Sequence, residues 1–559
     1  MSAIRRTYFI VNMKKTILSS VYSAVVSAVV MGLSLTSAQA QVIPYLPEDE
    51  PIKESCTSIV VGRLASDDGS VMTAHTCDAN YRTWVTMEPR KVFANGKDEI
   101  RWGLLHTEEP FDLRNTILKG SIPAPEGETF KFLNVAYPCM NEKQLAMGET
   151  TTDGKRELVN KDGLFQIEEL ERIALQRCST ARQAIALMGS LAEEYGYGDW
   201  GESLTVIDTK EAWLFEIYGS GKSGKKPGAL WAAQRIPDDH VCISANIPRI
   251  EVIDFKNPDK FMYASDLKER CKELGLWDGK SPFKFWPMVS SEKKNFSYRE
   301  FFVLSTLAPD LGLKFEDDEM PFSVKPKEKV SAQKMFELYR QTYDGTDLDQ
   351  VKDLKVEVKR RVRGEDGGMK TVTDTTAPIS TFMTNDTREL LNMLKPGCAP
   401  RRRTIAVIQC SYSEIVKLRG WLPDEIGGVA YFAFDNPAQT PRVPIYAGQT
   451  KLPAGFDVCG QHRYRKDAAI WKFRETNRVA TIGWDRTKDR VRKALADYDQ
   501  MLFEDTKALE EKAAKLIKEG KKEEAVELLN SYCSRLSASQ QRTWEEMREE
   551  FWSIFARSM

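Results

Sequence analysis

Soon after residue 55 the chain takes on the apolar pattern of β-strands. Residues 56–62 (CTSIVVG) form a β-branched run, residues 67–70 (DDGS) have turn composition, and residues 71–75 (VMTAH) resume the apolar pattern. Two such runs joined by an Asp-Gly turn predict a β-hairpin.

This hairpin would bring three reactive side chains together. A tight turn at its centre pairs residues whose numbers sum to about 137, which places Cys56 opposite about residue 80. His75 and Asp78 then lie within a few residues of Cys56 across the strand pair. The pattern therefore predicts a thiol, an imidazole and a carboxylate in one neighbourhood.

Other segments also show regular periods. Apolar residues at helical spacing predict a helix over 166–188, and residues 490–559 are strongly helical with long charged stretches. Strands are expected at residues 203–208, 212–217, 240–245 and 404–410, the first two as a hairpin. These elements predict an α+β protein with stacked sheets, helices outside them, and a helical C-terminal extension.

The N-terminus has the layout of a secretory signal peptide. Basic pairs at 5–6 and 14–15 precede an apolar run at 17–35, and residues 38–40 (AQA) form a small-x-small cleavage signal. The alternative is a transmembrane anchor, because the run approaches the length of a bilayer span. The cleavage signal favours a signal peptide. We therefore expect an exported protein, periplasmic or extracellular, with no stable membrane insertion after signal removal.

A leader separates this signal from the first strand. Residues 41–55 (QVIPYLPEDEPIKES) are rich in Pro, Glu and Asp and have no period, so they do not predict a packed element. The expected order is a signal peptide at 1–40, a propeptide at 41–55, the main domain at 56–489 and the helical extension at 490–559.

Composition and motifs argue against several classes of function. Lys plus Arg total 80 and Asp plus Glu total 81, a net charge of -1, which gives no electrostatic footprint for nucleic acid. There are four histidines and no HExxH motif, so neither a metal site nor an organic cofactor is indicated. Residues 219–226 (GSGKSGKK) resemble a phosphate-binding loop, but Lys226 replaces the Ser or Thr that would hold magnesium, so a surface loop is expected.

Cys56 begins a strand directly after the extended leader. A thiolate is a strong nucleophile, and its formation needs a nearby base. Cleavage between Ser55 and Cys56 would free an α-amino group with an ordinary pKa of about 7.7–8.0, so that one residue would carry nucleophile and base. The alternatives are a small buried hydrophobic residue or half of a disulfide, although 10 cysteines in 559 residues are too sparse for a disulfide framework.

Several short segments follow one another in a recognisable order. They are residues 56–62 (CTSIVVG), 65–70 (ASDDGS), 73–78 (TAHTCD), 140–149 (MNEKQLAMGE), 199–203 (DWGES), 231–239 (WAAQRIPDD) and 244–249 (SANIPR). In this order they resemble the cysteine dipeptidases, which are N-terminal nucleophile hydrolases related to penicillin V acylase and bile-salt hydrolase. The resemblance covers residues 56–428 in ordered islands.

The resemblance implies a fold, a processing step and residue roles. The fold would be the four-layer αββα arrangement with stacked antiparallel sheets, and the chain would expose Cys56 autocatalytically and hydrolyse amides. Cys56 would attack the scissile carbonyl to form a thioester, while its α-amino group moves the proton. Asp78 matches the aspartate that orients the nucleophile and its amine, and Asn246 matches an asparagine that helps to stabilise the oxyanion.

The sequence departs from the family pattern in two places. His75 stands where the family usually has arginine, which replaces a permanent charge by a group that titrates near neutrality; the alternative is a strand histidine without a chemical role. Residues 149–151 (ETT) lack the asparagine of the acylase branch, so the second oxyanion donor is unassigned. Arg402 and Arg403 are candidates for binding a substrate carboxylate, with surface charges as the alternative.

The expected activity is hydrolysis of dipeptides outside the cytoplasm, with short peptides as substrates. One alternative is another amidase of the same superfamily, acting on acyl-amino acids, bile salts or penicillin-like amides, because one superfamily hosts many substrates. A second alternative is a catalytically inactive peptide-binding protein. The sequence leaves the oligomeric state open.

Overall fold

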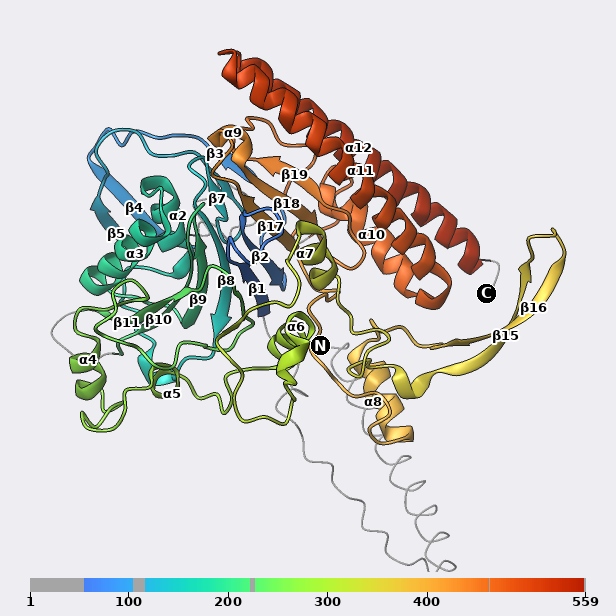
Figure 1. Ribbon diagram of the computed structural model, residues 1–559, viewed down its shortest axis with the longest axis horizontal. Helices are drawn as coiled ribbons and strands as arrows, with labels where there is room; N and C mark the ends of the chain where they lie inside the picture. The colour runs from blue at the N-terminus through green and yellow to red at the C-terminus, as the bar shows by residue number, and fades with distance from the viewer. Residues whose placement is uncertain (1–54, 104–115, 222–226, 462, 557–559) are drawn as a thin grey trace, which may run out of the picture. The chain divides into compact units, whose positions relative to one another are not determined.

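The computed structural model describes residues 55–103, 116–221, 227–461 and 463–556. These residues form a mixed α and β protein in which helices flank two large antiparallel sheets (Figure 1). The predicted signal peptide, residues 41–54 of the predicted propeptide and residues 222–226 of the predicted surface loop lie outside the described residues. In the described parts of the chain, no helix combines the length and the apolar character needed to cross a bilayer.

A seven-stranded sheet contains the predicted N-terminal hairpin at its centre. The two hairpin strands are buried along nearly their whole length, which explains their continuous apolar and β-branched composition. In sheet order, the strands are β14 (Ser323–Val324), β12 (Val241–Ser244), β1 (Ser55–Val61), β2 (Val71–Asp78), β17 (Tyr412–Leu418), β18 (Gly428–Phe434) and β19 (Val443–Tyr446).

An eight-stranded antiparallel sheet lies against the first one. In sheet order, its strands are β13 (Phe261–Tyr263), β11 (Ala229–Ile236), β10 (Ala212–Gly219), β9 (Gly201–Ile207), β8 (Ala146–Thr152), β7 (Met140–Asn141), β6 (Phe132–Asn134) and β3 (Thr86–Glu88). Two separate two-stranded ribbons are β4 (Lys97–Trp102) with β5 (Ile117–Pro123), and β15 (Val356–Arg363) with β16 (Met369–Thr376). The strands predicted near 203–208, 212–217 and 240–245 are confirmed as β9, β10 and β12.

The two large sheets meet through side chains that are partly polar. The Ser58 hydroxyl on β1 donates to the backbone carbonyl of Glu149 on β8 at 2.8 Å, and the hydroxyls of Thr73 and Thr205 lie 2.5 Å apart. Residues two positions apart on a strand share a face, so Cys56 points into the same space as Ser58. The fold therefore buries the candidate nucleophile between two sheets.

Two helices pack on the eight-stranded sheet. The helical spacing predicted over 166–188 is confirmed, but the segment is divided into α2 (Ile167–Arg177) and α3 (Ala181–Tyr195), and the second helix continues past residue 188. Thr180 begins the second helix by accepting a hydrogen bond from the backbone N–H of Gln183, which is a typical N-cap contact. The second helix packs on β9, β10 and β11.

The predicted C-terminal helices are confirmed and pack on the other sheet. They are α11 (Trp484–Lys518) and α12 (Lys522–Ala556), and α10 (Ala469–Thr481), which lies before the predicted segment, packs with them. The expected boundary at 489/490 lies inside α11. Trp544 is buried and donates to the carbonyl of Gln439 at 3.0 Å. The remaining α-helices are α4 (Leu267–Glu273), α5 (Phe285–Val289), α6 (Tyr298–Leu307), α7 (Ala332–Tyr339), α8 (Asn385–Leu394) and α9 (Asp424–Gly427).

The hairpin register differs from the tight-turn expectation. Cys56 pairs with Cys77, not with residue 80. The connection is a loop of residues 62–70, and the backbone N–H groups of Leu64 and Ala65 both donate to the carbonyl of Asp238. Because the loop is held by another part of the chain, it does not close as a two-residue turn.

The predicted strand at 404–410 was wrong. The Ala406 N–H donates to the carbonyl of Gln341, and the Cys410 N–H turns back to the carbonyl of Val407. Strand pairing in this region begins with β17, after this segment. Most apolar side chains of the segment are buried, with Ile408 only half-buried, so the pattern indicated burial but not a strand.

Candidate active site

Cys56 lies near the beginning of β1, and its side chain is fully buried. All ten cysteines fall in the described part of the chain and all are free thiols. Cys56 is therefore not half of a disulfide.

Asn246 holds the backbone nitrogen of Cys56. Its Oδ1 accepts a hydrogen bond from the Cys56 N–H at 3.2 Å, and its Nδ2 donates to the carbonyl of Thr151 at 2.7 Å. Asn246 follows β12 and has a φ of 65°, a left-handed conformation that asparagine tolerates better than most residues. The turn after β12 thus aims the amide at the start of β1.

Arg299 holds the other side of the same peptide unit. Its guanidinium donates to the carbonyl of Cys56 at 2.6 Å, to the carbonyl of Ala245 at 2.8 Å and to Asn246 Oδ1 at 2.9 Å. Burial lowers the Arg299 pKa to about 10, so the group stays cationic at neutral pH. The guanidinium places a positive charge directly beside the candidate nucleophile.

Asp78, Arg403 and Ser55 form a second cluster at the same strand end. Ser55 and Asp78 are paired across the hairpin. The Arg403 Nη2 donates to Asp78 Oδ2 at 2.6 Å and to the Ser55 hydroxyl at 2.8 Å. Thr76 donates to the same carboxylate oxygen at 2.8 Å.

The structure does not bring Arg402 to this cluster. The Arg402 side chain donates to the carbonyl of Asp349 at 3.4 Å, and its backbone N–H donates to Gln350. Of the two neighbouring arginines, only Arg403 contacts the other predicted site residues.

His75 lies between two buried carboxylates. Its Nδ1 is 3.1 Å from Glu414 Oε1, and its Nε2 is 3.6 Å from Glu149 Oε2. The rings of Tyr137 and Tyr412 contact the imidazole edge-on. Burial opposes protonation of His75, but Glu414 and Cys56 outweigh it and raise the His75 pKa well above 6.5.

We expect the substitution His75→Gln to cost more stability in acid than in base. A raised folded-state pKa means that protonation of His75 favours the folded state. This contribution is fully present below the unfolded pKa of about 6.5, and it is lost as the pH rises through the folded pKa. Urea unfolding between about pH 5.5 and 9 should therefore show a difference from the parent protein that shrinks with pH.

His240 supplies the matched control for this measurement. Burial lowers the pKa of His240, so His240→Gln should not show the same trend. A His75→Gln difference that is flat or grows with pH would contradict a favourable imidazolium–carboxylate contact.

The Cys56 thiol is held in its neutral form in this arrangement. Burial raises the pKa of Cys56 well above 9.0, and Cys77 and Glu149 add to the effect while His75 opposes it. A neutral thiol is a poor nucleophile. In this arrangement the Cys56 thiol is therefore not activated for attack.

Sequence reasoning missed three residues of this neighbourhood. Arg299 sits in the first turn of α6 (Tyr298–Leu307), between the two capping-box residues Ser297 and Glu300, and nothing in the local pattern separates it from an ordinary helix arginine. Glu414 and Cys77 carried a weak signal, because each is a chemically reactive residue on an inward-facing position of a buried strand.

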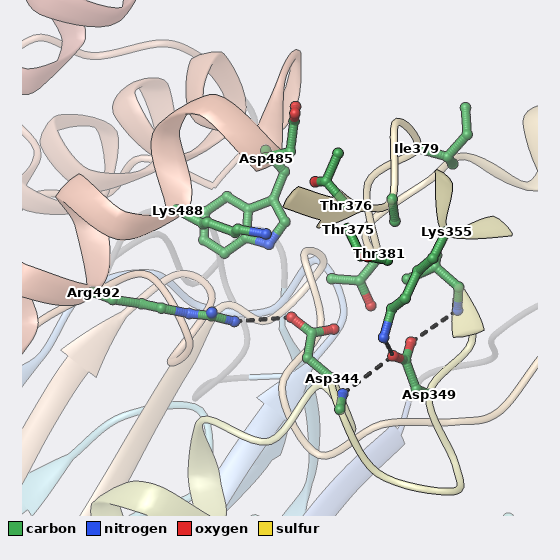
Figure 2. A pocket seen from close by; sticks show the side chains of 14 residues that line it. Asp344, Asp349, Lys355, Thr375, Thr376, Ile379, Thr381, Asp485, Lys488 and Arg492 are labelled. Atoms are coloured by element: carbon green, nitrogen blue, oxygen red, sulfur yellow. Dashed lines mark hydrogen bonds and ion pairs between the residues drawn. The ribbon is translucent and has the colours of Figure 1, made fainter. Parts of the chain in front are cut away.

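Two hollows of the described structure lie away from Cys56. One of about 170 Å³ is crossed by two ion pairs, Arg492 with Asp344 at 2.9 Å and Lys355 with Asp349 at 2.8 Å (Figure 2). The other, of about 390 Å³, is lined by Leu64 and loop lysines. Neither hollow is lined by the predicted site residues.

Comparison with known proteins gives consistent results. The chain is 24% identical over 410 residues to a probable dipeptidase of Latilactobacillus sakei, covering 70% of this chain and 74% of that protein. It is 25% identical over 416 residues to a probable dipeptidase of Salmonella dublin, covering 72% and 83%. It is 23% identical over 425 residues to dipeptidase A of Lactobacillus helveticus, covering 74% and 79%.

A family-level match covers most of the chain. The sequence model of peptidase family C69 matches residues 55–497. The match begins one residue before Cys56 and includes Asp78, Asn246 and Arg403. The chain therefore belongs to peptidase family C69.

Proposed function

We propose that this protein is an exported dipeptidase that uses Cys56 as an N-terminal nucleophile after removal of residues 1–55. The observation that carries the proposal is the pair of hydrogen bonds that fix the Cys56 backbone. Asn246 accepts a hydrogen bond from the Cys56 backbone N–H, and Arg299 donates one to the Cys56 carbonyl. Side chains therefore fix the position of the Cys56 nitrogen, as expected if that nitrogen takes part in catalysis. The names of the relatives, dipeptidase and probable dipeptidase, support dipeptides as the substrate class.

The arrangement of layers supports the N-terminal nucleophile fold as part of this proposal. Two antiparallel sheets pack face to face, with α3 on one and α10 and α12 on the other. This order agrees with a four-layer αββα protein whose nucleophile begins a central strand.

Processing would change the chemistry at Cys56. Hydrolysis of the Ser55–Cys56 amide leaves a carboxyl group on Ser55 and a free α-amino group on Cys56. That amine, with an ordinary pKa of about 7.7–8.0, would stay within reach of Asn246 Oδ1 and accept the thiol proton. One residue would then supply both the nucleophile and its base.

The reaction on a dipeptide follows from this arrangement. The Cys56 sulfur attacks the scissile carbonyl, and the α-ammonium group gives its proton to the departing amine. Water then hydrolyses the thioester and releases the second amino acid. Asn246 Nδ2 has two protons and uses one on Thr151, so the other is available to the oxyanion, a contact typically associated with a 10²–10³-fold effect on kcat.

Arg403 is the proposed recognition group for the substrate. Its Nε and Nη2 both donate to the Ser55 hydroxyl, at 3.3 and 2.8 Å. Loss of Ser55 would free these donors beside the nucleophile, where a dipeptide carboxylate could replace the hydroxyl. Asp78 would orient Arg403 through the 2.6 Å contact and lie next to the new N-terminus.

The test combines a mass measurement with a substrate panel. The full chain, expressed with its signal, should yield a mature protein that begins at Cys56 and hydrolyses dipeptides to free amino acids. Turnover of acylated amides in preference to dipeptides would assign another amidase activity. Calorimetric dipeptide binding by the processed protein without turnover would assign a binding protein, and recovery from the cytoplasm with the signal intact would overturn export.

A further inference from the structure

The neighbourhood of Cys56 also gathers metal-ligand atoms. One ligand atom each from Cys56, His75 and Cys77 lies within 4.8 Å of the other two, and all three side chains are fully buried. The hairpin register explains the grouping, because Cys56 and Cys77 are paired and His75 lies two residues before Cys77 on the same face. The ligands come from two strands, so no local motif marks them.

A carboxylate behind His75 orients the imidazole as in many metal sites. His75 Nδ1 contacts Glu414 Oε1 at 3.1 Å, and a proton on Nδ1 would be donated to that oxygen. The Nε2 atom is buried and has no hydrogen-bond partner among the described residues. A histidine that donates one ring N–H to a carboxylate and presents its other nitrogen is the usual geometry of a metal-bound imidazole.

Glu149 is the candidate for a fourth donor, although it does not belong to the group whose ligand atoms all lie within 4.8 Å of one another. Its Oε2 lies 3.6 Å from His75 Nε2 and, among the described residues, it has no hydrogen-bond partner. In a tetrahedral zinc site with Zn–N and Zn–O distances near 2.1 Å, the two ligand atoms are about 3.4 Å apart. The observed separation of 3.6 Å is close to this value, whereas the carboxylate lies farther from at least one of the two sulfurs.

We propose that Cys56, Cys77 and His75 bind one thiophilic divalent cation, Zn²⁺ in the first place, that Glu149 becomes the fourth donor by a shift of its side chain, and that the bound ion blocks the Cys56 sulfur. Two thiolates, an imidazole and a carboxylate form a donor set that suits Zn²⁺ far better than Mg²⁺ or Ca²⁺. The two sulfurs lie within 4.8 Å of each other, and the S–S separation in a tetrahedral site with a Zn–S distance of 2.3 Å is about 3.8 Å, so they have to approach by at most about 1 Å. Side-chain rotation of the two cysteines provides such a movement.

Binding has a defined proton balance. The two thiols lose one proton each, and an imidazolium at His75 loses its Nε2 proton while the Nδ1 proton stays on the Glu414 hydrogen bond. The Cys56 sulfur then donates its electron pair to the metal and is not free to attack a carbonyl. The expected consequence is inhibition of dipeptide hydrolysis that a chelator reverses. This inhibition rests on the proposed function, whereas the binding of the metal ion does not.

The experiment measures binding and inhibition separately on the mature, metal-stripped protein. Titration with Co²⁺ should give one equivalent of bound ion with a thiolate-to-cobalt absorption band, and Zn²⁺ should displace it. Zn²⁺ at micromolar concentration should also inhibit dipeptide hydrolysis, and a chelator should restore the rate. Absence of a stoichiometric Co²⁺ complex with thiolate character would overturn the proposal.

Ligand variants test which atoms bind. Cys77→Ala and His75→Gln should each weaken Zn²⁺ binding by at least about 100-fold, since loss of even an outer-shell partner costs 10–100-fold. The matched control is Cys271→Ala, which removes another buried cysteine in α4, a helix packed on β11 of the other sheet. Unchanged Co²⁺ affinity in both ligand variants, with circular dichroism of the parent protein, would place the metal elsewhere and overturn the proposal.

The outcomes also separate this inference from the proposed function. A protein that binds Co²⁺ through thiolates but hydrolyses no dipeptide would support the metal site and contradict the dipeptidase. A dipeptidase that is insensitive to Zn²⁺ and binds no Co²⁺ would support the enzyme and contradict the metal site.

Discussion

Replacing Cys56 by alanine is expected to abolish both maturation and dipeptide hydrolysis. The variant lacks the sulfur that attacks the substrate, and removal of a catalytic nucleophile typically lowers kcat by about 10⁴–10⁶-fold. If the chain cleaves itself, the Ser55–Cys56 amide also remains intact. Stability should change little by comparison, because deleting one buried sulfur leaves only a small cavity.

Intact mass and N-terminal sequencing measure the maturation half of this prediction. The parent protein should begin at Cys56, whereas Cys56→Ala should retain residues before position 56. Hydrolysis of a dipeptide panel, followed by release of free amino acids, measures the other half. Cys271→Ala is the control, since it removes a buried cysteine whose surroundings do not include the site.

Two contrary results would be decisive in different ways. Full maturation of Cys56→Ala together with loss of turnover would show that another peptidase removes the leader. The assignment of Cys56 as the nucleophile would then be supported. Retained turnover would exclude Cys56 as the nucleophile, whatever the state of the N-terminus.

Much of the candidate site could be predicted because it lies on one hairpin. Cys56, His75 and Asp78 are close in sequence, and any pairing of β1 with β2 brings them together. The tight-turn rule paired Cys56 with about residue 80, whereas the structure pairs it with Cys77. The difference arose because the connecting loop is bound to Asp238. That contact is distant in sequence, so no local turn rule could have included it.

The parts that were missed depend on such distant contacts. Arg299 reaches Cys56 from a helix 243 residues away, and Glu414 reaches His75 across 339 residues. Single-sequence periods report which face of an element is buried, but not which elements become neighbours. For the same reason, the segment at 404–410 was predicted as a strand, although its backbone N–H groups form hydrogen bonds to Gln341 and within the segment, and not to a neighbouring strand.

Removing the Asp78 carboxylate is expected to produce the largest loss of stability among the site variants. Asp78 is buried and Arg403 is nearly so, with side-chain exposures of 0% and 13%. Breaking a buried ion pair from one side typically costs about 3–5 kcal/mol, because it leaves the other charge without its partner. Asp78→Ala should therefore lower the urea midpoint strongly, whereas an exposed ion-pair variant such as Lys493→Ala should cost at most about 1 kcal/mol.

The double variant Asp78→Ala/Arg403→Met distinguishes an unpaired charge from lost packing. If the stranded guanidinium causes the loss, replacing it by an apolar side chain should recover a large part of the stability, with a coupling energy of about 1–3 kcal/mol. If the two single costs simply add, the ion pair does not govern stability at this strand end.

Activity should not follow stability in this series. The double variant lacks the group proposed to bind the substrate carboxylate, so its KM for dipeptides should stay high even where its urea midpoint recovers. Arg403→Lys keeps a charge but loses the paired donors that reach Ser55 and Asp78, and it should show an intermediate KM with a kcat nearer the parent value. Recovery of both stability and KM in the double variant would remove Arg403 from substrate recognition and leave it a purely structural partner of Asp78.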